Sequence, residues 1–153
     1  MEFISWLKAV IMTAGTAMVP ILEVKAAIPI GTAMGLPLWE SFIFAVLGGL
    51  VPCPFIILFS RKMISWLKTT AILGWFGRFM ERHVDQKADK VRKYSLLGLF
   101  ILVAAPLPGT GVWTGSLVAA LLDLRLKHAV PVILLGNIVC SLCILMITGV
   151  FVF

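Results

Sequence analysis

The sequence predicts an all-α integral membrane protein, and three observations lead to this fold class. Of the 153 residues, 61% are hydrophobic and only 13% are charged, whereas soluble domains are about half apolar and about a quarter charged. Uncharged runs cover 41–60, 94–122 and 129–153, and about 20 apolar residues suffice to cross the hydrocarbon core. Finally, helix breakers interrupt two apolar stretches whose positions differ by 84 residues.

We expect one membrane domain over 1–153 that is built as an inverted repeat. The first repeat (1–60) and the second (95–153) each contain a re-entrant helical hairpin followed by a transmembrane helix. Between them, 61–94 carries nine basic and three acidic side chains, so the positive-inside bias places it in the cytoplasm as an amphipathic helix. We therefore expect a multi-pass protein of the inner (plasma) membrane.

In the first repeat, one arm is expected over 4–19, a break over 20–31 and a short second arm to Leu36. The spanning helix that follows covers 41–60. It contains Pro52 and Pro54, and proline is a common cause of helix kinks, so we expect a kink at these positions.

The linking segment and the second repeat follow the same logic. Apolar residues recur at helical spacing within 62–93, which favours a helix lying in the cytoplasmic interface. A soluble linker hairpin is the alternative. The second hairpin has arms over 96–105 and 112–122, each only about 15 Å long at 1.5 Å per residue, or half of the core. This length favours a re-entrant hairpin over two complete spans. The last helix is expected over 130–153.

The first break is the stretch Glu23–Gly31, in which Glu23 and Lys25 are the only charged residues between Lys8 and Glu40. A charge at the bilayer centre costs about 2.5–3.5 kcal/mol on insertion scales, so such residues usually face a cavity or a partner. Glu23 is therefore the candidate proton-binding residue, and Lys25 its counter-ion or a ligand for an anionic headgroup. The alternatives are an internal Glu–Lys pair or a loop that reaches the outer interface.

The second break, Leu107–Gly115, carries no charge. The arm that starts near Val112 points its N-terminal N–H groups and the positive end of its dipole into the break, which suits an anion such as phosphate or carboxylate. Trp113 either stacks on a substrate or simply packs, and the threonines either bind or only relieve the backbone. The candidate substrate-binding or coupling residues are Glu23, Lys25, Pro29, Gly31, Pro106, Pro108, Gly109, Thr110, Gly111, Trp113, Thr114 and Gly115.

Small residues recur at the same 84-residue offset in the two second arms. Small residues four positions apart let helix backbones approach closely in lipid, so we expect the two second arms to cross near the midplane about a pseudo-twofold axis; ordinary tight packing is the alternative. The matched residues are Ala27, Gly31 and Gly35 in the first arm, and Gly111, Gly115 and Ala119 in the second.

Three further polar residues are candidates for a gate or mouth. Asp123 and Arg125 flank the cytoplasmic side, where they form a surface pair or a gate. Asn137 is a lone polar residue in the last helix, and an interhelical hydrogen bond is the favoured interpretation. Cys140 and Cys143 share a helix face, but with no His or acid nearby we expect them to pack rather than to bind metal.

Several classes of function are disfavoured. The sequence lacks GxxxxGK[ST], His-Glu-x-x-His, G-x-S-x-G and an Asp-rich metal cluster, so we expect no enzyme activity, no cofactor and no metal. Beside membrane spans, the net charge of +6 indicates orientation and contact with lipid headgroups, not nucleic-acid binding.

The two breaks carry a family resemblance. Glu-x-Lys-Ala-Ala-Ile-Pro-x-Gly within 20–31, and Pro-Leu-Pro-Gly-Thr-Gly-x-Trp-Thr-Gly within 106–115, continuing to 119–123, resemble the bacterial and archaeal family labelled small multidrug export proteins, over essentially the whole chain. More distantly the layout is similar to the DedA/VTT superfamily, which implies facing hairpin tips, lipid movement and dependence on the proton motive force. Glu23 matches its acidic position, but the arginines of its second hairpin have no counterpart between Tyr94 and Leu122.

Our leading hypothesis is a small secondary transporter or lipid translocase. Glu23 would couple protons, and the second break would contact an anionic lipid or an amphipathic small molecule. The rival hypotheses are a non-transporting scaffold or assembly subunit and a passive pore. Membrane lipids are expected partners, and so is a second copy of the chain, because one copy offers little protein to surround a cavity.

Overall fold

The computed structural model describes residues 2–68 and 88–152, and within them every regular element is a helix. This confirms the all-α prediction for the described part of the chain, while most of the expected interfacial helix in 61–94 lies outside it. The elements are α1 (Phe3–Met18), α2 (Glu23–Ala33), α3 (Leu38–Leu50), α4 (Pro52–Lys68), α6 (Ala88–Ala104), α7 (Val112–Leu121) and α8 (Leu126–Val152).

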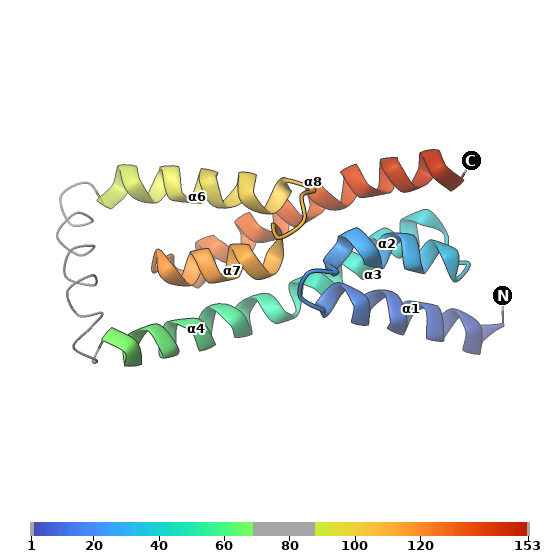
Figure 1. The fold of residues 1–153 in the computed structure, drawn as a ribbon, viewed down its shortest axis with the longest axis horizontal. Coiled ribbons are helices and arrows are strands. Elements are labelled where there is room, and N and C mark those ends of the chain that lie inside the picture. Colours follow the sequence, from blue (N-terminus) through green and yellow to red (C-terminus); the bar gives the residue numbers. More distant parts are fainter. Residues whose placement is uncertain (1, 69–87, 153) are drawn as a thin grey trace.

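The helices form two hairpins that lie at opposite ends of an elongated bundle (Figure 1). The α1–α2 hairpin occupies one end and the α6–α7 hairpin the other, and their turns meet near the middle. Two longer rods run past both: α3 continued by α4, and α8. Each short second helix contacts helices from both halves of the chain. α2 packs on α1, α3 and α8, and α7 packs on α4, α6 and α8.

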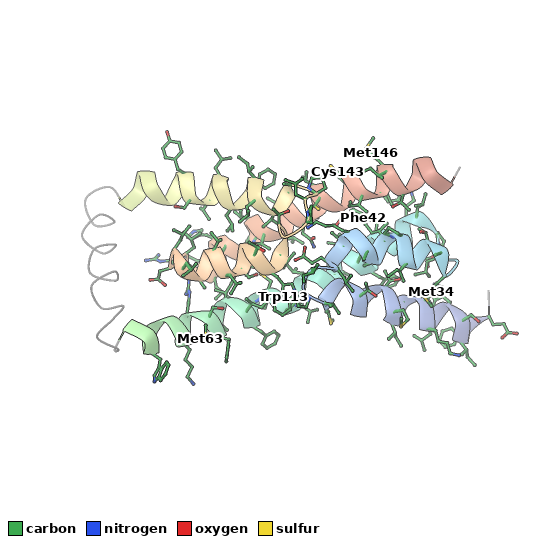
Figure 2. The ribbon with its side chains drawn as sticks, viewed as in Figure 1. Met34, Phe42, Met63, Trp113, Cys143 and Met146 are labelled. Atoms are coloured by element: carbon green, nitrogen blue, oxygen red, sulfur yellow. The ribbon has the colours of Figure 1, made fainter. Side chains whose placement is uncertain are left out.

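Two stretches, Leu38–Met63 and Leu126–Gly149, are long and apolar enough to cross a membrane. Large apolar side chains also cover the outside of the bundle; Phe3, Phe55 and Met146 each expose 70% or more of their surface. Soluble proteins rarely expose contiguous apolar surface on this scale. Together with the composition, this indicates a membrane protein whose outer surface faces lipid. Figure 2 shows side chains pointing outward along the bundle, with Met146 labelled among them.

The long first rod is interrupted where proline predicts it. α3 ends at Leu50 and α4 begins at Pro52, and the Val51 N–H bonds to the carbonyl of Gly48. Pro52 has no N–H to offer that carbonyl, so the tighter bond of Val51 replaces the regular helical one. The expected kink at Pro52 and Pro54 is thus observed as a break between α3 and α4.

Other boundaries differ from expectation. The first break is confined to 19–22, because α2 begins at Glu23 and continues through Pro29. A helical proline removes one backbone hydrogen bond, and membrane helices tolerate this when neighbours accommodate the freed group. The last helix begins at Leu126 instead of 130 and contains Pro131.

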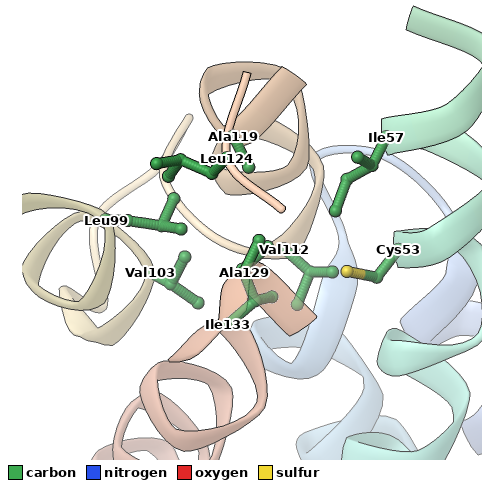
Figure 3. Close-up of a cluster of buried hydrophobic side chains, with 9 residues drawn as sticks. All are labelled: Cys53, Ile57, Leu99, Val103, Val112, Ala119, Leu124, Ala129 and Ile133. Carbon is green, nitrogen blue, oxygen red and sulfur yellow. The ribbon is translucent and has the colours of Figure 1, made fainter. Parts of the chain in front are cut away.

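Two apolar clusters hold the halves of the bundle together. The larger joins α4, α6, α7 and α8 (Figure 3), and the smaller joins α1, α2, α3 and α8. The three cysteines are free; Cys53 and Cys140 are buried in these two clusters, as expected for small apolar residues, and Cys143 is half-buried. The larger cluster consists of Cys53, Ile57, Leu99, Val103, Val112, Ala119, Leu124, Ala129 and Ile133.

The small residues of the short helices do not make the expected crossing. A β-carbon added to Gly31 would lie 2.5 Å from the Thr13 hydroxyl oxygen and 2.7 Å from that of Ser41, on α1 and α3. One added to Gly115 would overlap Val103 of α6. Each of these glycines therefore packs within its own half of the chain, and the prediction that the two second arms cross was wrong; the arms meet end to end instead.

The contacts that end the two short helices recur at a spacing of 88 residues instead of 84. The N–H of Leu36 bonds to the carbonyl of Gly31 at 3.0 Å, and the N–H of Leu124 bonds to that of Ala119 at 3.0 Å. Both are the closing bond of a Schellman turn. The two breaks differ in length, 19–22 against 105–111, so an alignment on the break sequences does not give the spacing of the helices that follow.

Candidate functional site

The Glu23 carboxylate lies at the junction of the two hairpins. Glu23 is the first residue of α2, is only 4% exposed, and adopts a φ of +46° that L-residues other than Asn and Asp seldom adopt. One of its oxygens, Oε1, accepts a hydrogen bond from the backbone N–H of Trp113 at 3.0 Å. This N–H belongs to the first turn of α7, which has no side-chain cap of its own. Glu23 therefore caps the helix of the opposite hairpin.

Lys25 completes a charged pair and reaches across the same junction. Its Nζ lies 3.5 Å from Oε2 of Glu23 and donates a hydrogen bond to the backbone carbonyl of Thr110. The side chain of Lys25 is 15% exposed and that of Glu23 is 5% exposed. The internal Glu–Lys pair is therefore present, and both of its members also bind backbone of the second break.

Gly111 makes the approach of the carboxylate possible. Its φ is +135°, and a β-carbon at this position would overlap the carboxylate of Glu23, with Cδ only 2.6 Å away. Glycine is the residue that accepts both this backbone angle and this approach. The uncharged second break thus places the backbone of Gly111, which has no side chain, against the charged carboxylate of Glu23. This agrees with the sequence, in which the first break carries the charges and the second carries none.

Trp113 also binds the first hairpin through its ring, at the end of α1. The indole Nε1 donates to the carbonyl of Met18 at 3.0 Å. Met18 is the last residue of α1, where helix carbonyls lack intrahelical partners. Figure 2 shows Trp113 at the middle of the bundle, beside the junction. The ring is therefore fixed by a hydrogen bond to the protein.

The two threonines of the second break bond to their own loop. The Thr110 hydroxyl donates to the carbonyls of Ala105 at 2.7 Å and Leu107 at 2.8 Å, and the Thr114 hydroxyl donates to that of Gly109 at 2.7 Å. Such bonds satisfy backbone that has left a regular helix. Pro106, Pro108 and Gly109 are exposed on the same loop.

Pro29, Gly31 and Gly115 lie further along the short helices, so the structure does not bring them to the junction. Pro29 is inside α2, and the two glycines each pack against helices of their own half of the chain. Among the predicted site residues, the structure brings together Glu23, Lys25, Thr110, Gly111 and Trp113.

Asn137 forms the expected interhelical contact. Its Nδ2 donates to the carbonyl of Val46 on α3 at 3.4 Å, and its side chain is buried beside Gly49. A β-carbon at Gly49 would stand 3.4 Å from this Nδ2 and 3.7 Å from Cγ1 of Val24. Asn137 therefore lies next to the start of α2 and links α8 to α3 at the middle of the bundle.

The expected pair of Asp123 and Arg125 is replaced by another. Oδ1 of Asp123 lies 3.6 Å from Nε of Arg61 on α4, and Nη2 of Arg61 donates to the carbonyl of Leu124. Arg125 is exposed, and its backbone carbonyl accepts the N–H groups of His128 and Ala129 as α8 begins. Asp123 adopts a φ of +50° in the Schellman turn, which directs this turn toward α4.

Sequence reasoning missed Arg61 and Met18 as members of these contacts. Arg61 was counted only as part of the basic segment, and Met18 contributes a backbone carbonyl, which no sequence pattern identifies. Among residues 2–68 and 88–152, no group of three or more His, Cys, Asp or Glu side chains is placed to hold a metal ion.

The comparisons with known proteins agree with the family resemblance of the two breaks. Residues 23–143, which include Glu23, Lys25, the whole second break and most of α8, match the family described as "Putative small multi-drug export protein". No curated protein and no solved structure shows significant similarity to the chain, and the more distant DedA/VTT resemblance stays a prediction. Because the match covers most of the chain, this protein belongs to that small multidrug export protein family.

Proposed function

We propose that this protein is a small secondary transporter that moves an anionic or amphipathic substrate, lipids included, and couples this movement to protons through Glu23. The family description supports export. The observation that carries the proposal is the buried Glu23 carboxylate, which bonds to the opposite hairpin at Trp113 N–H. Ionisable residues inside membrane spans are rare and usually mark ion or substrate pathways.

The contacts of Glu23 supply a route from proton binding to movement. Hydrogen bonds to an ionised carboxylate are roughly twice as strong as neutral ones. Protonation of Glu23 removes the charge that attracts Lys25 and weakens the acceptance of the Trp113 N–H. We infer that the two hairpin tips then separate, which leaves the N–H groups of α7 and the Lys25 ammonium to an anionic group.

Separation of the tips is required because the junction is closed in this arrangement. Gly111 has no room for even a β-carbon beside Glu23. We infer that the two halves are an inverted repeat whose hairpins are re-entrant, since the short helices start at the middle and run to opposite ends of the bundle. Broken helices that meet at the midplane of inverted repeats are the usual binding sites of secondary transporters.

The placement in the cell follows from the charges. With 61–94 in the cytoplasm by the positive-inside bias, the turn between α7 and α8 faces the cytoplasm and the α2–α3 turn faces outward. We further propose a homodimer in the inner membrane, in which a second copy covers part of the exposed apolar surface.

A scaffold function is the second candidate, and one observation favours it. The polar groups of the two breaks bond to one another: the Glu23 carboxylate to Trp113, Lys25 to Thr110, and the Trp113 ring to Met18. Such mutual bonding needs no ligand. A protein that only holds partners in the membrane would gain stability from the same junction.

Reconstitution with Glu23→Gln separates these functions. Proteoliposomes with internal pyranine report proton entry, and NBD-labelled phosphatidylglycerol reports lipid movement by dithionite quenching. We expect an imposed proton gradient to drive both signals in the native protein and Glu23→Gln to lower them at least tenfold. Glu40→Gln is the matched control, because Glu40 also accepts a hydrogen bond from a tryptophan, Trp6 Nε1 at 2.7 Å, but on α3.

The outcomes discriminate clearly. Movement that ignores both Glu23→Gln and the gradient would contradict coupling and favour a passive pore. No movement of either probe by well-folded native protein would favour the scaffold. Lys25→Met adds a second readout, since it removes the counter-ion and keeps the carboxylate; we expect it to alter lipid movement more than proton entry.

A further inference from the structure

The turns that end α2 and α7 have the same backbone geometry but different side-chain support. Leu36 and Leu124 occupy equivalent places in the two Schellman turns, and each is 3% exposed. At the α7 end, Arg61 binds the Leu124 carbonyl and pairs with Asp123. At the α2 end, the positions 88 residues away from Arg61 and Asp123 are Gly149 and Gly35.

The glycine at 149 leaves the α2 end without an equivalent of the arginine. Among the described residues, a β-carbon at Gly149 would meet Cδ1 of Leu38 alone, at 3.8 Å. Asp123 and Gly35 both have positive φ, +50° and +92°, so the turns match in backbone. The two turns therefore differ in their side chains. Arg61 and Asp123 make charged contacts at the end of α7, whereas the contact at the end of α2 is apolar.

The short helices also differ in what they pack against. α7 packs mainly on α4, which belongs to the other half of the chain, and less on α6 and α8 of its own half. α2 shows the reverse preference, because it packs mainly on α1 and α3 and less on α8. The two hairpins are thus in different arrangements relative to the two rods, although the turns that end α2 and α7 have the same backbone geometry.

We propose that the two hairpins exchange these arrangements and that Arg61 is the lock that holds the arrangement seen here. This inference rests on the transport proposed above. In the second arrangement α7 packs mainly on α6 and α8, in the way that α2 packs on α1 and α3 in this structure. At the same time α2 packs mainly on α8, in the way that α7 packs on α4 in this structure. The Arg61 contacts with Asp123 and Leu124 must break for α7 to leave α4.

The Arg61 contacts shift the equilibrium between the two arrangements but do not exclude the second one. Arg61 is 27% exposed and Asp123 87% exposed in their side chains, and exposed ion pairs are weak. A bond from a guanidinium to a backbone carbonyl adds to this pair. We therefore expect loss of Arg61 to change the ratio of the two arrangements about fivefold, which corresponds to about 1 kcal/mol.

Spin-label distances in the full-length protein in lipid nanodiscs test the proposal without any transport assay. One label pair, at Met63 and Leu121, reports α4 against α7; the other, at Met34 and Met146, reports α2 against α8. All four residues are exposed, and Figure 2 shows Met63 toward one end of the bundle and Met34 and Met146 toward the other. Cys143 is replaced by Ser, and the buried Cys53 and Cys140 are retained.

We expect Arg61→Gln to lengthen the first distance in a larger fraction of molecules and to shorten the second in the same fraction. Asp123→Asn, which is milder, should act in the same direction by a smaller factor. Gly35→Asp with Gly149→Arg would build the equivalent lock at the other end, and we expect it to favour the second arrangement even with Arg61 present.

Distributions that stay unchanged in the Arg61 and Asp123 variants would overturn the proposal, as would a change in one distance without the opposite change in the other. The readout is independent of substrate. If the distances respond but neither proton entry nor lipid movement occurs, the exchange stands and transport fails; if transport occurs with fixed distances, only the exchange fails.

Discussion

Gly111 of the second hairpin lies directly against the carboxylate of Glu23 in the first, with its backbone at a φ of +135°. The pair are 88 residues apart, the same spacing that relates the ends of the two short helices. Equivalent positions of the two halves thus face each other, and the space between them holds one carboxylate. A side chain at both positions would not fit.

Gly111→Ala is predicted to open this junction. The new β-carbon would overlap the carboxylate of Glu23, and alanine would be strained at this backbone angle. Overpacking of this kind costs about 1–3 kcal/mol. The backbone at φ +135° and ψ −156° is a conformation that essentially only glycine adopts, and it costs other residues about 1–3 kcal/mol. We expect a lower midpoint of thermal unfolding in detergent, followed by tryptophan fluorescence.

Gly98→Ala is its control, because Gly98 is in α6 and an added β-carbon there meets nothing within 4 Å. In a helix this change is neutral or slightly stabilising. Equal destabilisation by both substitutions would show that close approach to Glu23 is not what position 111 provides.

Trp113→Phe is predicted to loosen the junction without removing it. The change deletes the ring N–H that bonds to the Met18 carbonyl but leaves the backbone N–H that bonds to Glu23. The expected loss is about 1 kcal/mol, the net value of one hydrogen bond. Chemical unfolding in a mild detergent measures it.

Trp39→Phe serves for comparison, since Trp39 is 65% exposed and its ring contacts Phe42. We expect its effect on stability to be smaller. If Trp113→Phe changed neither stability nor the spin-label distances, the bond between Met18 and Trp113 would have no role in holding the tips together.

Gly48→Ala is predicted to separate α3 from α1. An added β-carbon would stand 2.5 Å from the backbone carbonyl oxygen of Ala14 and 2.8 Å from its Cα, and backbone cannot yield as a side chain does. We expect a loss of about 1–3 kcal/mol and faster maleimide labelling of single cysteines introduced along α1. Gly15→Ala, one residue from that contact and in open space, should leave both unchanged; a larger effect at Gly15 would contradict this packing.

The sequence predicts much of this architecture because its strongest signals are local. Apolar runs set the long rods, and Pro52 sets the break between α3 and α4. The contacts of the site are not local. The bond between Glu23 and Trp113 joins residues 90 positions apart, and the choice of Arg61 over Arg125 as the partner of Asp123 depends on how α4 lies beside the α7–α8 turn.

The failure of the 84-residue offset has a specific physical reason. The offset of 84 comes from matching the small residues of the two break sequences, whereas Pro20 and Pro106, which mark the ends of the first arms, are 86 residues apart. The second break is longer, and α2 starts early because a helix tolerates Pro29. Which residues of the two halves face one another depends on where α2 and α7 begin. The amino-acid composition of the breaks does not determine these starting residues.

The bonds between the two breaks also set a condition on biogenesis. During synthesis, α1 and α2 enter the membrane before residues 110–113 exist, and at that stage the Met18 carbonyl and the Glu23 charge lack the partners they have in the finished protein. Unpaired groups in hydrocarbon are costly. The first hairpin is therefore expected to stay hydrated or bound to a chaperone until the second hairpin is synthesised. The two halves of this protein then insert interdependently.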